Sequence, residues 1–270
     1  MKTHVYSLAE EIGAHLTELD NIISQAESTF GENDVLYDIL CRAGCVLAVS
    51  ALEGFLKELN TAVQSDLNEN IATFSNMPKN MQRDFCRKIV YFKDVPEADI
   101  QKRIGQLTAF FHANSVNIEI GAFNYKENEN KNPSANMIDG LFNKYGINSV
   151  LHCLSGSKFE AVFDNDSATD IVLRREIKRM RATVYKFPYK ELPKKFNMED
   201  WVPIKGQTVP TSLWHTFLEN LLRRRHGIVH ADTQANPTSW HTLKEDSNKL
   251  DILFHGVLFA VSSLISKDIA

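Results

Sequence analysis

Residues 221–232 read LLRRRHGIVHAD, and this cluster of cations is the part of the sequence best suited to chemistry. Arg225 and His230 stand five positions apart, and His226 directly follows the arginine. A guanidinium keeps its charge and can hold phosphate oxygens, whereas an imidazole titrates near neutrality and can carry a proton. The cluster therefore offers the two groups that phosphodiester chemistry needs, a fixed positive charge and an acid or base.

The cluster ends a segment with helical periodicity. At about 100° per residue, one apolar stripe contains Trp214, Phe217, Leu218, Leu221, Ile228 and Val229. Arg225 falls inside this stripe, while Arg223, His226 and His230 fall on the opposite side. A straight helix separates Arg225 from His230 by about 140°. For both to meet one ligand, the helix must bend near Gly227 or a second subunit must contribute.

An arginine on an apolar stripe is costly without an anionic partner. The candidate partner is Glu53, which follows the apolar run AGCVLAVSAL of residues 43–52. This run is apolar all round, so the sequence predicts that it is buried on most sides.

Two other interpretations of the cluster stay open. In the first, Arg225 closes a structural ion pair and both histidines are ordinary surface residues. In the second, His226 and His230 bind zinc, but no glutamate follows the first histidine and no third ligand is evident. The sequence therefore predicts neither a metal nor a cofactor.

The elements around the cluster are predicted to be helical. Periodicity covers residues 5–30, about 34–67, 79–92, 97–114, 135–145 and 170–184, the helix with the cluster, and a last helix to about 264. Expected N-caps are Asn33 or Asp34, Ser134, Thr211 or Ser212, and Thr238 or Ser239; Gly31 and Gly146 are expected to close helices. Residues 124–134 and 186–203 are predicted loops, and residues 158–163 a short strand or helical turn. The predicted fold class is all-α, a helical bundle.

Composition limits the broad class of protein. The chain has 270 residues, of which 43% are hydrophobic, so a sizeable core is expected. A net charge of −4 means that any contact with nucleic acid must come from a local basic patch. The four cysteines form no Cys-x-x-Cys pair, so they are expected to be buried, reduced and structural. Residues 1–11 lack an apolar signal core, and the ten residues 43–52 are too few to span a bilayer. The sequence thus predicts a cytoplasmic protein without a membrane span.

A local basic patch is present in residues 174–195, which carry nine basic and two acidic residues. The candidate RNA-binding residues are Arg174, Arg175, Lys178, Arg179 and Arg181. Tyr185, Phe187 and Tyr189 are interleaved with the basic residues. Because basic side chains hold phosphates and aromatic rings stack on bases, this segment is a candidate RNA-binding surface. The alternative is a solvated helix face and a loop whose rings pack on the core.

The sequence RRHGIVHAD resembles the R-x4-6-H motif of the HEPN superfamily, in which an arginine and a polar residue precede a histidine. Here these residues are Arg225, His226 and His230. The earlier segment RAGCVLAVSALEGFLKELN is similar to the early helix of HEPN domains, where an acidic residue often faces the motif; Glu53 fits this place. The segment NPSANMIDGLFNKYGI resembles an insert of the RiboL-PSP-HEPN branch. The resemblance covers roughly residues 35–265 and implies one HEPN-like domain over residues 1–270, with an insert at about 115–205.

The resemblance implies metal-independent RNA cleavage, in which the ribose 2′-OH attacks the adjacent phosphorus. His230 would act as base or acid and Arg225 would hold the phosphate oxygens. His226 would orient His230 or touch phosphate, and Glu53 would orient Arg225. HEPN nucleases commonly pair two motifs, so a symmetric homodimer is expected, with RNA as substrate and an antitoxin or defence protein as a possible partner. A toxin or defence role rests on the same resemblance. The alternative is a non-catalytic HEPN-like dimer that binds nucleotide, RNA or protein.

Overall fold

The computed structural model describes residues 1–118, 133–196, 198–199, 201–202, 210–230 and 238–269. Over these ranges the chain is helical and contains no strand, only the single bridge between Thr73 and Asn117. The α-helices are α1 (His4–Thr29), α2 (Asp34–Asn70), α3 (Lys79–Val90), α4 (Glu97–Ala113), α5 (Ala135–Phe142), α6 (Val150–Leu154), α7 (Ser167–Met180), α8 (Leu213–Val229) and α9 (Trp240–Ile269). The predicted all-α class is confirmed.

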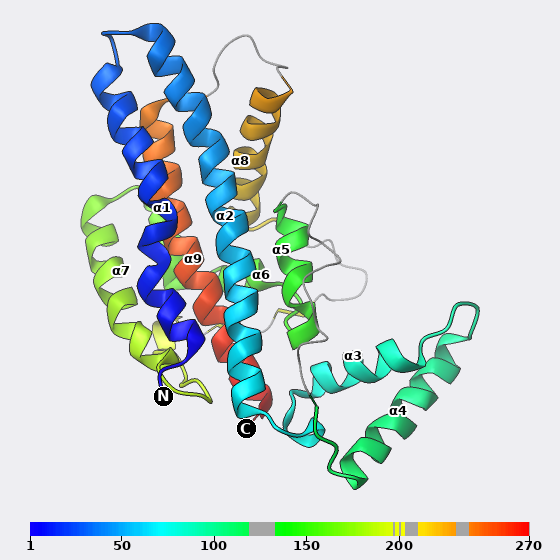
Figure 1. Ribbon diagram of the computed structural model, residues 1–270. Coiled ribbons are helices and arrows are strands. Elements are labelled where there is room, and N and C mark those ends of the chain that lie inside the picture. The colour runs from blue at the N-terminus through cyan, green and yellow to red at the C-terminus, as the bar shows by residue number, and fades with distance from the viewer. Residues whose placement is uncertain (119–132, 197, 200, 203–209, 231–237, 270) are drawn as a thin grey trace.

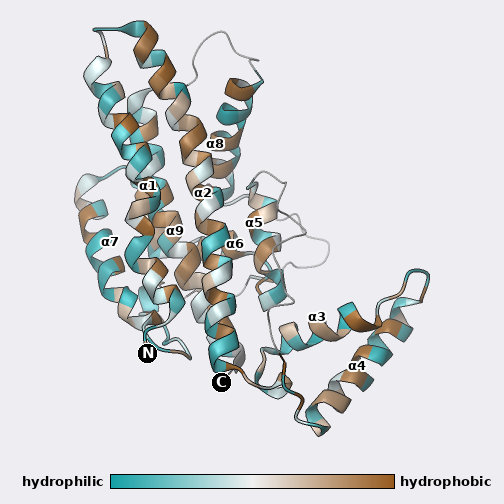
Figure 2. Cartoon of the chain, in the orientation of Figure 1, coloured by the Kyte–Doolittle hydropathy of each residue, from teal (hydrophilic) through white to brown (hydrophobic). Residues whose placement is uncertain are grey.

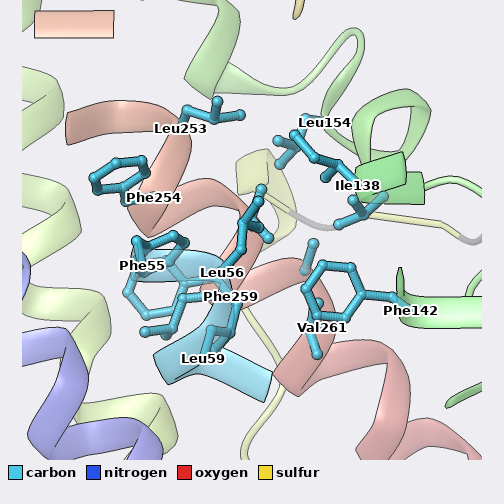
Figure 3. Packing of buried hydrophobic residues seen from close by; sticks show 14 of the residues in the cluster. Phe55, Leu56, Leu59, Ile138, Phe142, Leu154, Leu253, Phe254, Phe259 and Val261 are labelled. Atoms are coloured by element: carbon cyan, nitrogen blue, oxygen red, sulfur yellow. The ribbon is translucent and has the colours of Figure 1, made fainter. Parts of the chain in front are cut away.

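Helix α9 forms the centre of the bundle, with α1 and α2 along it and α6 and α8 behind them (Figure 1). Every residue of α9 from Ile252 to Ser266 is buried, because other elements cover all its faces. Figure 3 shows the middle of this core, where the ring of Phe55 on α2 stacks on Phe254 of α9 with centroids 4.3 Å apart. Burial of such aromatic pairs fixes the register of α2 against α9.

Helices α2 and α9 are, by length and composition alone, apolar enough to cross a membrane. For α9, 89% of the most apolar window is buried inside the bundle, which is usual for a core helix. For α2, only 39% of that window is buried. The prediction that residues 43–52 are buried on most sides is therefore too strong, since Ala43, Val46 and Leu47 remain partly exposed.

The caps explain where the helices begin and end. The side chains of Asn33, Ser134 and Ser212 accept hydrogen bonds from the first turns of α2, α5 and α8, as the sequence predicts. Gly31 and Gly146 adopt positive φ angles of 77° and 88° after helix ends. The basic helix differs from its prediction: it begins at Ser167, because Asp166 caps it, and a 3-10 turn (Arg181–Val184) follows it.

The segment between α2 and α7 adds elements around the bundle. Helices α3 and α4 form a hairpin that stands away from the bundle, whereas α5 and α6 pack against α8 and α9 (Figure 1). Residues 158–163 belong to a 3-10 helix (Lys158–Asp164). The predicted loop at 124–134 lies mostly outside the described residues, and the insert at 115–205 stays a prediction.

Candidate functional site

Helix α8 carries the cationic cluster at its C-terminal end. Ser212 caps the helix, and Trp214, Leu218 and Leu221 are buried with 0% exposure, which fixes its rotation against α2. The helix continues through Gly227 to Val229, and His230 is its C-cap. Of the two ways in which Arg225 and His230 could meet one ligand, the bend near Gly227 is therefore excluded, and the contribution of a second subunit stays a prediction. In a continuous helix, Arg225 and His230 point about 140° apart.

The three consecutive arginines lie in different environments. Arg223 is exposed, whereas Arg224 reaches Asp246 of α9, with Nη2 and Oδ2 2.6 Å apart. The carboxylate of Asp246 is 5% exposed, and this burial raises its pKa to about 6 although the charge of Arg224 opposes the rise. This buried ion pair of Arg224 with Asp246 is not the one that the sequence predicts, which joins Arg225 to Glu53.

Arg225 is half-buried on the side of α8 that faces α2. Its charge reaches the thiol of Cys45 on α2: burial raises the pKa of this thiol, while Arg224 and Arg225 both act to lower it. All four cysteines are free and buried, as predicted. Arg225 is thus near enough to the seam between α2 and α8 for its charge to act on Cys45.

Glu53 does not lie beside Arg225. Its carboxylate pairs with Lys57 one turn further along α2, with Nζ and Oε1 2.8 Å apart. Glu53 follows Cys45 by eight residues, which is about 12 Å along a helix. The predicted pairing of Glu53 with Arg225 is wrong, because sequence alone does not fix the height at which α8 crosses α2.

The two histidines of the motif lie together at the surface. Both are exposed, and their rings lie one turn apart with centroids separated by 4.2 Å. The backbone N–H of His230 also donates to the carbonyl of His226 over 3.0 Å. The structure therefore brings His226 to His230, in keeping with a positioning role for His226.

The predicted RNA-binding residues lie on α7 and in the turn that follows it. Arg175, Lys178 and Arg179 are exposed. Arg174 instead pairs with Asp251 of α9, and Arg181 contacts His255 with Nη2 and Nε2 3.1 Å apart. Figure 1 places α7 and α8 on opposite sides of α1, α2 and α9. Within one chain, the structure does not bring the α7 cations to the motif.

The aromatic residues after α7 are less available for stacking on RNA bases than the sequence suggests. Tyr189 is 5% exposed and donates a hydrogen bond to Asp66 over 2.8 Å. Phe187 packs edge-on against Tyr189, and Tyr185 packs edge-on against Tyr6. Of the three rings, only that of Tyr185 is largely exposed, at 43%. Tyr189 is therefore a core residue, and the alternative of rings packed on the core holds for it.

Sequence reasoning missed Asp246, which forms the ion pair with Arg224. It also missed a buried group formed by Asp139, His152 and His215. These residues come from α5, α6 and α8, and no spacing motif connects them. The sequence feature that could have indicated Asp246 is its place as an aspartate shortly before the apolar stripe of α9 begins.

The helical bundle and the motif at the end of α8 together define a HEPN domain. The chain belongs to the RiboL-PSP-HEPN family, whose sequence profile matches residues 10–255. HEPN domains are often ribonucleases. No curated protein and no solved structure matches the chain.

Proposed function

We propose that this protein is a metal-independent endoribonuclease of the HEPN type. The observation that carries the proposal is the end of α8, where a half-buried arginine and two adjacent exposed histidines have the spacing of the R-x4-6-H motif, within the residues that the family profile matches. In the proposed reaction His230 takes the proton of a ribose 2′-OH, which attacks the adjacent phosphorus. The 5′-oxygen leaves with a proton, and the products carry a 2′,3′-cyclic phosphate and a 5′-OH.

Arg225 holds the phosphate in this proposal. A guanidinium can bind two non-bridging oxygens in one plane and stabilise the charge that builds up on them. His226 positions the ring of His230, since the two rings are in contact.

One chain does not complete the site. Arg225 and His230 point about 140° apart, and α8 is continuous between them. A two-fold axis beside α8 would set Arg225 of one copy against His230 of the other. We therefore propose a homodimer whose active site lies at the interface.

An apolar stripe on α2 favours this assembly. At about 100° per residue, Leu36, Ile39, Ala43 and Val46 fall on one side of α2. Ile39 is 56% exposed and Leu36 is 40% exposed, next to Val35 at 73%. In Figure 2 the N-terminal end of α2 carries several residues in the brown of hydrophobic residues. A second copy of this chain would bury this stripe and bring two motifs together.

The test is RNA cleavage by purified variants that stay folded. His230→Ala and Arg225→Ala should each lower the cleavage rate at least about 100-fold, the smallest usual contribution of a general acid or base. His241→Ala, at an exposed histidine of α9, is the matched control and should cleave as the wild type does. Unchanged cleavage by both motif variants would refute the proposal.

We further propose a toxin or defence role, for which growth should stop on expression of the wild type and continue with His230→Ala.

A further inference from the structure

The second chemical cluster of the molecule lies at the opposite end of α8 from the motif. Asp139 of α5, His152 of α6 and His215 of α8 each offer one ligand atom, and these atoms all lie within 4.8 Å of one another. The two histidines are 9% exposed, and their rings are 4.5 Å apart. The carboxylate of Asp139 is 14% exposed. Two imidazoles and a carboxylate make up a donor set that zinc prefers.

Each of these side chains is already oriented by a second partner. Asp139 Oδ1 accepts from the backbone N–H of Leu151 over 3.1 Å, and its Oδ2 accepts from the Ser149 hydroxyl over 2.7 Å. His215 Nδ1 lies 2.6 Å from the Ser212 hydroxyl, and its Nε2 faces Asp139 Oδ2 at 3.2 Å. Adjacent ligands of a tetrahedral zinc ion lie roughly 3.3 Å apart, given bonds of about 2 Å. His215 Nε2 and Asp139 Oδ2 therefore already have the spacing of two zinc ligands.

The orientation of His152 follows from its carbonyl partner. His152 Nε2 lies 2.7 Å from the carbonyl oxygen of Pro210, which can only accept, so this nitrogen donates. Its Nδ1 then faces the Ser149 hydroxyl at 2.6 Å, and that hydroxyl also lies 2.7 Å from Asp139 Oδ2. Metal-binding histidines usually donate their other N–H in this way. Ser149 thus links two ligand groups that a metal ion would join directly.

Nucleophilic catalysis is a weaker explanation of the same groups. Ser212, His215 and Asp139 have the residue types of a hydrolase triad. Ser212 is, however, 6% exposed and accepts the backbone N–H of His215 as the N-cap of α8. Ser149 has the same role at α6 and is 3% exposed. Both serines are structural caps, and neither presents its oxygen to a substrate.

We propose that Asp139, His152 and His215 form a zinc site, with water as the fourth ligand. Of the three residues, His152 also lines a cavity of about 400 Å³, together with Ser155, Glu199 and Trp201. The bound ion would tie α5 and α6 to the first turn of α8. This site is independent of RNA cleavage, because the motif lies at the other end of that helix.

A second group of possible ligands, His4, Asp66 and Glu69, is a poorer candidate. Both oxygens of Asp66 already accept hydrogen bonds, from the backbone N–H groups of His4 and Val5 and from the hydroxyl of Tyr189. His4 and Glu69 are exposed. This group caps α1 and serves as a control for the zinc experiment.

The test is calorimetric titration of the chelator-treated, dialysed protein with Zn²⁺. We expect one strong site per chain, and a Co²⁺ derivative with the visible absorption of a tetrahedral ion. Asp139→Asn keeps the oxygen that accepts from Leu151 but loses the charged ligand, so the affinity of this variant for zinc should fall at least about 100-fold. Replacing a residue that only hydrogen-bonds to a metal ligand usually lowers the affinity about 10- to 100-fold. His215→Gln should show the same loss, and bound zinc should raise the unfolding temperature of the wild type but not of these two variants.

Two controls separate this site from other histidines. Glu69→Gln and the double variant His226→Ala/His230→Ala should bind zinc as the wild type does. Absence of strong zinc binding by the wild type would overturn the proposal, as would wild-type affinity in both Asp139→Asn and His215→Gln. The double variant separates this test from that of the proposed function, because it lacks the motif but retains the zinc ligands.

Discussion

At the C-terminal end of α8, neighbouring residues of the same type have unlike surroundings. Arg223 faces solvent, Arg224 pairs with Asp246, and Arg225 lies near the seam with α2. A rotation of about 100° per residue accounts for the difference. Of the three, Arg225 is half-buried and stands at the arginine position of the R-x4-6-H spacing, and for this reason we propose that it binds the phosphate.

The burial of Asp246 gives the stability of the protein a dependence on pH, which the charge of Arg224 opposes. Burial raises the folded-state pKa of Asp246 from 3.8 to about 6. Protonated Asp246 stabilises the folded chain fully at pH values below the pKa of Asp246 in the unfolded chain. This stabilisation is lost as the pH rises through the pKa of Asp246 in the folded chain. A shift of about two units corresponds to about 3 kcal/mol.

Asp246→Asn should remove this dependence. Between about pH 4 and pH 6 the free energy of unfolding of the wild type should fall relative to that of the variant, by up to about 3 kcal/mol. Urea unfolding at several pH values measures the difference. Asp164→Asn, at an exposed aspartate, is the control and should follow the wild type. A difference in the free energy of unfolding between wild type and Asp246→Asn that stays constant with pH would show that the carboxylate does not titrate in this range.

At the scale of elements, α7 presents its cations on the side of the bundle away from the motif (Figure 1). Arg174, Arg175, Lys178 and Arg179 are all exposed, and of these four Arg174 pairs with Asp251. We infer that α7 holds a distal part of a long RNA and does not bind the phosphate that is cleaved.

Replacing Arg175, Lys178 and Arg179 together by glutamine should weaken RNA binding. The slope of log affinity against log salt should fall by about 0.7 for each phosphate of single-stranded RNA that the variant no longer neutralises. The control removes three exposed cations from α3 and α4, namely Lys79, Lys102 and Arg103. Filter binding over a range of salt concentrations gives both slopes. Equal effects of the two triple variants would mean that α7 is an ordinary solvated face.

Most elements of the fold can be predicted from the sequence, because caps and periodicity are local. Asn33, Ser134 and Ser212 cap helices as predicted. The packing of one helix on another is not local, and the predicted pairing of Glu53 with Arg225 fails for this reason. The motif itself follows from the spacing of Arg225 and His230, whereas the group of Asp139, His152 and His215 exists only after three separate helices have packed together.

At the scale of the whole molecule, α2 is a core helix along one side and an exposed apolar surface along another. Only 39% of its most apolar window is buried in a single chain. A second copy of the chain would cover this surface and supply the second motif. The proposed active site and the incomplete burial of α2 therefore have one explanation.

Ile39→Glu should convert the proposed dimer into a folded monomer, because it places a charge in the centre of the apolar stripe. Light scattering during gel filtration measures the mass, and RNA cleavage should fall with dimer content. Ile171→Glu makes the same change at a residue of α7 that is 60% exposed, and it should remain a dimer. A wild type that is monomeric at high concentration, or a dimer insensitive to Ile39→Glu, would count against this interface.

We propose that Arg225 and His230 cleave RNA through the ribose 2′-OH without a metal ion. The most direct measurement incubates the purified protein with RNA in excess chelator, while circular dichroism confirms that it stays folded, and identifies the product ends. We predict 2′,3′-cyclic phosphate and 5′-OH ends, with no cleavage at a position carrying a single 2′-deoxy sugar. Cleavage that persists at the deoxy position, or equally in His230→Ala, would contradict the account.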